Sequence, residues 1–132
     1  MSIQTVAVLA IMLLALAAAF QIGLAAGAPW GAAAYGGRVV SRDGVLPSRY
    51  RLGSGAAALV LLSAIWIVLA AVRAVGRGPV SSPMLTVVLW CLAAMFGLNT
   101  LANARGLHPV ERWGAGTVTA LLALSCALIA AN

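Results

Sequence analysis

The sequence predicts an all-α protein, an antiparallel bundle of four transmembrane helices in a single domain, residues 1–132. Hydrophobic residues make up 64% of the chain and charged residues only 8%, which is too little charge to cover a water-soluble domain. The apolar residues lie in uncharged blocks of about twenty, the length that crosses a hydrocarbon core roughly 30 Å thick. Because the blocks are continuous rather than alternating, they favour helices over the strands of a barrel.

The predicted spans are residues 3–26, 54–72, 84–104 and 113–131. The first lacks the basic start of a signal peptide, and its apolar run is too long for one, so we expect a retained helix. Its end is marked by Gly27 and by Pro29, which interrupts helical hydrogen bonding.

The connections carry start signals for the later helices. The first connection, residues 27–53, is long enough to hold a short helix at the membrane surface. Ser82–Pro83 has the form of an N-cap followed by proline at the first helical position. His108–Pro109 opens the fourth span in the same way, and Glu111 places a negative charge in the first turn, where the helix dipole favours it.

The positive charges lie between the spans. The chain has a net charge of +6, and its only acids are Asp43 and Glu111. In such positions the charges indicate membrane topology and contact with anionic lipid headgroups, not nucleic-acid binding. The first and third connections together hold six arginines and the second holds two, which predicts that the first and third are cytoplasmic and both termini are outside. The arginines are Arg38, Arg42, Arg49, Arg51, Arg105 and Arg112 against Arg73 and Arg77.

Polar side chains inside the spans must find partners or raise the free energy of the folded state. Asn99 and Asn103 are four residues apart, hence on one helix face. Antiparallel packing brings their end of the third span beside Gln21, Ser54, Thr117 and Thr119, below the first and third connections. The predicted polar pocket consists of Gln21, Asn99, Asn103, Trp30, His108 and Glu111. Interhelical hydrogen bonds that hold the bundle, each contributing about 0.6–2 kcal/mol, are the alternative interpretation.

Gly23 and Gly27 are spaced by four residues, as in helix contacts between small residues. We expect them to let helix backbones approach closely, within the chain, in a homo-oligomer or in a larger membrane complex. Cys91 and Cys126 fall at similar depth in the other leaflet, and the sequence leaves open whether they pair.

Catalytic and metal chemistry have little support. His108 and Glu111 form the only acid–base pair at short spacing, with no third group and no evident nucleophile. A metal site needs three or four ligands at suitable spacing. No span contains an acid, which excludes proton-coupled exporters built around a membrane-embedded glutamate. We therefore expect no enzyme activity and no cofactor.

The chain contains the stretches QIGLAAGAPWGAAAYGG, GVLPSRYRLGS and NARGLHPVERWGAGTVTALLAL. This pattern, GAPWG…GG…LPxRxR with a later asparagine and a closing ER, resembles an uncharacterised family of small bacterial four-helix integral membrane proteins. The resemblance implies a bacterial inner-membrane location and the four-helix architecture, and it implies no activity. Gly114 and Gly116 depart from the family's start of the fourth helix. The matching positions are Gln21, Gly27, Ala28, Pro29, Trp30, Gly31, Gly36, Gly37, Leu46, Pro47, Arg49, Arg51, Asn103, Glu111 and Arg112.

Two functions follow as hypotheses. The first is a non-catalytic accessory or self-associating membrane protein, whose partners are membrane lipids and other membrane chains. The alternative is binding or transport of a small neutral or lipid-like molecule through the polar pocket.

Overall fold

The computed structural model describes residues 2–39 and 43–132, and over these residues the protein is all-helical. Its membrane-length helices are long and apolar enough to cross a bilayer, so the chain is a multi-pass membrane protein. The π-helical turn η3 runs directly into α4, so the fourth membrane-length helix is Val110–Ala130. The elements in order are α1 (Ile3–Ala26), η1 (Gly31–Ala33), η2 (Tyr35–Gly37), α2 (Ser48–Ala71), α3 (Ser82–Ala104), η3 (Val110–Ala115) and α4 (Gly116–Ala130).

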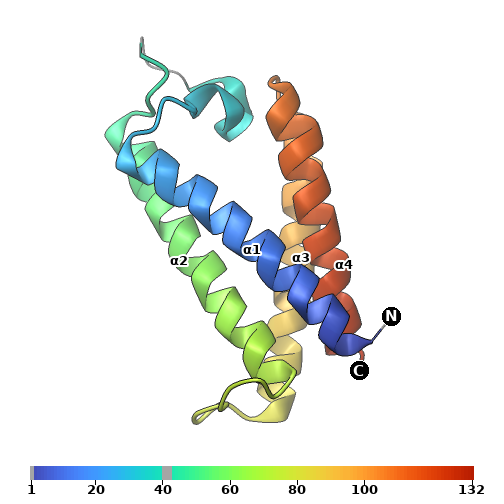
Figure 1. Ribbon diagram of the computed structural model, residues 1–132. Coiled ribbons are helices and arrows are strands. Elements are labelled where there is room, and N and C mark those ends of the chain that lie inside the picture. Colours follow the sequence, from blue (N-terminus) through green and yellow to red (C-terminus); the bar gives the residue numbers. More distant parts are fainter. Residues whose placement is uncertain (1, 40–42) are drawn as a thin grey trace.

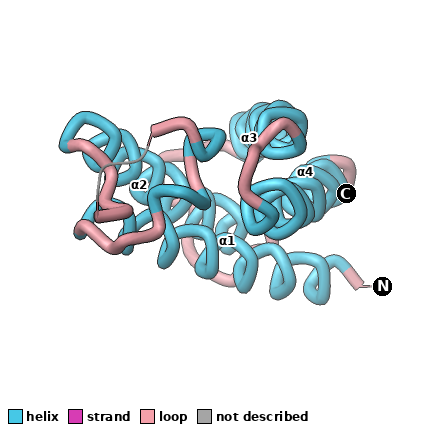
Figure 2. The backbone as a smooth tube through the Cα atoms, turned by 90° about the horizontal axis from the view of Figure 1, so that it is seen from above, coloured by secondary structure: helices cyan, strands magenta, loops and turns pink. Residues whose placement is uncertain are grey.

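The four helices form two antiparallel pairs. α1 packs mainly on α2, and α3 packs mainly on α4 (Figure 1). The pairs lie close together at the end that holds both termini and the α2–α3 connection, and they splay apart at the other end (Figure 1). Seen from above, α2 and the α3–α4 pair lie on opposite sides (Figure 2). We call the splayed end the arginine-rich end, because both connections there carry arginines.

The main core fills the region where the pairs meet. Small side chains such as Ala7, Ala10 and Ala64 are buried there, and they let the helices approach closely without polar contacts. Larger side chains fill the remaining space between the pairs: Leu14, Val68, Leu89, Phe96, Leu122 and Cys126. Cys126 is a buried free thiol and Cys91 is an exposed free thiol, so the two cysteines do not pair.

A second, smaller core lies at the arginine-rich end. Leu24 of α1 is buried against Ala34 and Leu46 of the first connection, with Phe20 and Tyr50 packed around them. This cluster holds the first connection against the helices, so the connection is a structured part of the bundle.

The last three helices begin earlier than the predicted spans, and α2 and the fourth helix also end one residue earlier. α1 matches residues 3–26, but α2 begins at Ser48 rather than 54, because its first turns include charged residues that a hydropathy criterion excludes. The N-cap of α3 is Ser81, whose hydroxyl accepts from the Met84 amide at 3.4 Å, so the expected N-cap at Ser82 is wrong by one residue. The fourth helix starts at Val110 rather than 113.

The end of α1 turns the chain back over its own helix. Gly27 adopts a left-handed conformation with φ of 100°, which favours glycine. The Ala28 amide then bonds to the Gly23 carbonyl at 2.9 Å, as in helix ends closed by a left-handed residue. Arg51 Nε donates to the Ala25 carbonyl at 3.0 Å. A cation is favoured there by the helix dipole, so the arginine joins α1 to α2.

Candidate functional site

Residues 29–37 cross the open end of the bundle, and we call them the strap. They leave α1 and reach the start of the fourth helix, spanning the two pairs where these splay apart (Figure 1). The expected short surface helix is represented by the two turns η1 and η2. Three contacts anchor the strap, one to each neighbouring part of the bundle.

The first anchor is Trp30, which folds back onto α1. Its ring stacks on Phe20 with ring centroids 5.9 Å apart and an interplanar angle of 5°. A Cβ added at Gly23 would lie 2.3 Å from the indole, so only glycine leaves room for the ring on this face of α1. Gly23 thus makes room on α1 for Trp30, a side chain of the connection that follows this helix.

The second anchor is Tyr35, which lies on the first turns of α2. Its hydroxyl donates to the Tyr50 carbonyl at 2.9 Å and lies 3.0 Å from the hydroxyl of buried Ser54. A Cβ added at Gly53 would be 3.0 Å from the tyrosine oxygen. Ser54 is therefore satisfied by the strap and does not face a polar pocket.

The third anchor joins the strap to the third connection. The Gly36 amide donates to Glu111 Oε1 at 2.7 Å, and the Leu107 amide donates to the Gly36 carbonyl at 3.3 Å. Both backbone groups of Gly36 are thus used. Glu111 is 6% exposed and packs on Gly106, where an added Cβ would lie 2.6 Å from Oε2. That second carboxylate oxygen is buried without a partner among the described residues.

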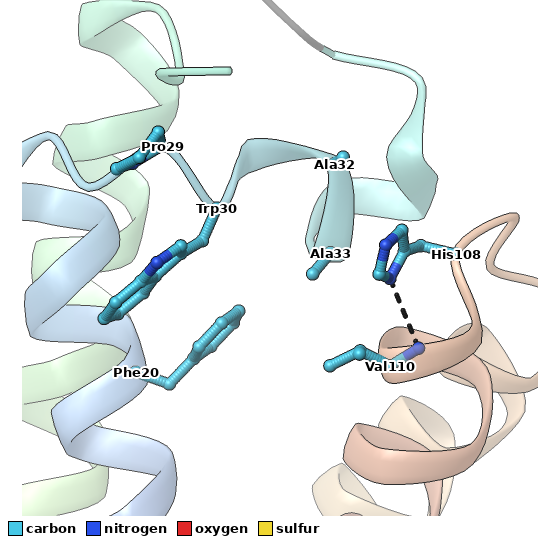
Figure 3. Close-up of a pocket in the computed structure, with 7 residues that line it drawn as sticks. All are labelled: Phe20, Pro29, Trp30, Ala32, Ala33, His108 and Val110. Carbon is cyan, nitrogen blue, oxygen red and sulfur yellow. Dashed lines mark hydrogen bonds between the residues drawn. The ribbon is translucent and has the colours of Figure 1, made fainter.

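An open pocket of about 300 Å³, which we call the cavity, lies beneath the strap. Figure 3 shows its walls: Phe20 and Trp30 on one side, the strap alanines above, and the start of the fourth helix opposite. The walls are largely apolar. The seven lining residues are Phe20, Pro29, Trp30, Ala32, Ala33, His108 and Val110.

His108 is held in place by its own helix start. Its Nδ1 accepts from the Val110 amide at 3.2 Å (Figure 3). Its carbonyl accepts from the Arg112 amide at 3.0 Å. Two amides that a helix start leaves without an intrahelical partner are satisfied in this way. Because Nδ1 accepts, the neutral ring carries its proton on Nε2.

The predicted carboxamides do not gather at this cavity. Asn99 is exposed on α3. Asn103 is half-buried and its Nδ2 lies 3.4 Å from Thr119 Oγ1. Gln21 is half-buried, with its Oε1 buried and unpartnered among the described residues. Of the six residues predicted to form a pocket, Trp30 and His108 line the cavity. Glu111 holds the strap by accepting a hydrogen bond from the Gly36 amide.

A polar contact between α3 and α4 involves a residue that the sequence interpretation missed. Thr100 Oγ1 lies 2.9 Å from Thr119 Oγ1, which donates to the Ala115 carbonyl at 2.9 Å. With Asn103, these hydroxyls form an interhelical group of the kind that fixes membrane helices. Thr100 precedes Asn103 by three residues and therefore lies on the same face of α3. This spacing could have identified Thr100 from the sequence. Thr117 is exposed.

The two glycines proposed for helix packing serve the strap instead. Gly23 contacts the Trp30 ring and Gly27 provides the left-handed turn, beside the Arg51 guanidinium. The described residues contain no group of three His, Cys, Asp or Glu side chains placed to hold a metal ion. The chemistry available at the site is thus apolar packing with a few hydrogen-bond donors.

Comparisons of the chain with protein-family models, with curated proteins and with solved structures each find no match.

Proposed function

We propose that the protein is a non-catalytic multi-pass membrane protein that binds a lipid-like molecule in the cavity beneath the strap. The observation that carries the proposal is the cavity itself, about 300 Å³ between two splayed helix pairs and under an anchored connection. This volume is at the lower end of the range for small-molecule sites, about 300–1,000 Å³.

The chemistry of the walls indicates an apolar ligand. The Phe20 and Trp30 rings form one wall, and Val110 with the strap alanines forms much of the remainder. A strongly polar molecule would lose its hydrogen bonds to water here without replacing them. An alkyl chain or ring system would instead gain packing contacts with two aromatic side chains.

The location belongs to the same proposal. We place the chain in a bacterial inner membrane with the arginine-rich end in the cytoplasm, because arginine is enriched in short cytoplasmic connections. This orientation opens the cavity toward the cytoplasmic leaflet. The support is the arginine distribution, with Arg73 and Arg77 as the two arginines of the opposite end.

A second candidate, association with another copy or another membrane chain, is favoured by Asn99. This carboxamide is exposed on α3 next to exposed Leu98, on a helix that lipid surrounds. A hydrogen bond to a neighbouring helix stabilises a carboxamide that otherwise faces lipid. In this candidate the cavity beneath the strap stays without a specific ligand.

The binding proposal is tested by fluorescence quenching in reconstituted vesicles. In a Trp66→Phe, Trp90→Phe, Trp113→Phe variant, Trp30 is the remaining tryptophan. Added dibromostearic acid is expected to quench Trp30 in a saturable way, near one molecule per protein, because bromine in the cavity contacts the indole.

The matched control keeps Trp113 in place of Trp30. Trp113 lies at the same end and is 71% exposed, against 47% for Trp30, and it does not line the cavity, so it reports the surrounding lipid. Its quenching is expected to rise in proportion to the probe without saturating. If Trp30 and Trp113 show the same proportional quenching, the cavity has no specific lipid-like ligand, and the second candidate is preferred.

A further inference from the structure

We propose that His108 binds the head of the ligand, and that the ligand is an amphiphile with an anionic oxygen group, a carboxylate or a phosphate, on an apolar tail. The inference rests on the proposed function and adds the chemical class of the bound molecule. It comes from the polar groups that the apolar cavity contains and from the solvent that surrounds it.

Because lipid surrounds the cavity, the polar groups of its walls determine which molecule it selects. Hydrocarbon tails are as apolar as the cavity walls, so an alkyl chain gains little hydrophobic free energy on moving from the bilayer into the cavity. Selectivity for one molecule over bulk lipid must then come from packing and from hydrogen bonds. The lining side chains that carry a polar atom are Trp30 and His108.

Both of these side chains offer donors. The indole Nε1–H of Trp30 can only donate. Nδ1 of His108 is occupied as an acceptor of the Val110 amide, which leaves Nε2–H as the donor on the other side of the ring. Neither donor has a hydrogen-bond partner in the part of the chain that the structure describes. A ligand that complements them needs an acceptor.

The charge around the cavity selects an anionic acceptor. Arg38 follows the strap directly, and Arg105 and Arg112 flank the third connection on either side of His108. The acids at this end are Asp43 and Glu111, and one oxygen of the Glu111 carboxylate accepts a hydrogen bond from the Gly36 amide. The arginines outnumber these acids, so the local potential attracts anions and repels cations.

The test compares probes that share one tail and differ in the head. The Trp30-only variant is titrated with dibromostearic acid, with the brominated stearyl alcohol and with the brominated stearylamine. The acid is expected to bind about tenfold more tightly than the amine, a difference of about 1.4 kcal/mol, because a carboxylate accepts a charge-assisted hydrogen bond from the His108 Nε2–H and a protonated amine cannot accept one. A brominated phosphatidylglycerol arm distinguishes a bilayer phospholipid from a free fatty acid as the source of the head.

The His108→Ser variant separates the head contact from folding. Serine retains an acceptor that caps the start of the fourth helix, but its short side chain lacks the Nε2 donor. The preference for acid over amine is expected to fall about tenfold. Alcohol binding is expected to fall less than acid binding, because a neutral hydroxyl accepts a weaker hydrogen bond than a carboxylate does. Arg77→Gln, at the opposite end, is the control and is expected to keep the wild-type preference.

Two outcomes overturn the inference in distinguishable ways. Saturable quenching with equal affinity for all three heads, or a preference that His108→Ser leaves intact, refutes the headgroup role and leaves lipid binding in place. Absence of saturable quenching by any probe refutes both the headgroup role and the proposed function.

Discussion

A Glu111→Ala variant is expected to release the strap from the third connection and to lower the free energy of unfolding by about 1–3 kcal/mol. The substitution removes the 2.7 Å bond from the Gly36 amide, leaving that amide without its acceptor. It also leaves space beside Gly106, on which the carboxylate packs. The loss is reduced by the removal of Oε2, which is buried and unpartnered among the described residues.

The measurement is equilibrium unfolding in mixed micelles together with amide hydrogen exchange at Gly36 and Leu107. Glu111→Gln is the matched variant, because its carbonyl oxygen can still accept from Gly36. We expect it to stay within about 1 kcal/mol of the wild type and to keep slow exchange. If Glu111→Ala leaves both the unfolding free energy and the exchange of the Gly36 amide unchanged, the third anchor has no structural importance.

A Gly23→Ala substitution is expected to displace Trp30 from α1 and to weaken ligand binding about tenfold or more. The new Cβ would lie 2.3 Å from the indole ring, which is rigid and must move as a whole. Its stacking on Phe20, a contact of a kind that contributes about 0.5–1.5 kcal/mol, is then lost. One wall of the cavity moves with it.

Gly97→Ala is the matched control for this substitution. Gly97 lies inside α3, and an added Cβ there meets nothing within 4 Å. Alanine is a better helix former by about 1 kcal/mol, so this variant is expected to be as stable as the wild type or more stable. Trp30 emission and Trp30 quenching are measured for both variants. Equal ligand binding by Gly23→Ala and Gly97→Ala would contradict the inference that Gly23 makes room for the Trp30 indole.

The sequence predicts the four helices well because their signal is local. Length and hydropathy of each block are sufficient to identify a membrane-length helix. The boundary of α2 is predicted poorly, since Arg49 and Arg51 are helical although they are charged. Arg51 is accommodated by the Ala25 carbonyl, a contact that depends on where α1 ends beside α2.

The candidate site is predicted only in part because its contacts join distant segments. Trp30 and His108 were identified as members of one site, and both line the cavity. The spacing of Gly23 and Gly27 is shared by helix-packing motifs and by this turn, so spacing alone does not distinguish them. The bond between Gly36 and Glu111 joins residues 75 positions apart, and no local pattern predicts it.

The asparagines show how helix geometry limits such predictions. Asn99 and Asn103 share a helix face approximately, yet successive residues at this spacing are rotated by about 40° at 3.6 residues per turn. That rotation places Asn103 against Thr119 while Asn99 is exposed.

Thiol labelling determines whether lipid surrounds the four membrane-length helices of the described residues. In a Cys126→Ala background, native Cys91 and single cysteines at Met12, Leu59 and Leu124 are exposed positions in the middle of α3, α1, α2 and α4. The variants with a new cysteine also carry Cys91→Ala. With a charged maleimide on both sides of intact membranes, these four thiols are expected to stay unlabelled, while a cysteine replacing Asp43 reacts fully. Labelling of the four mid-helix thiols as fast as that of the Asp43→Cys variant would contradict the account.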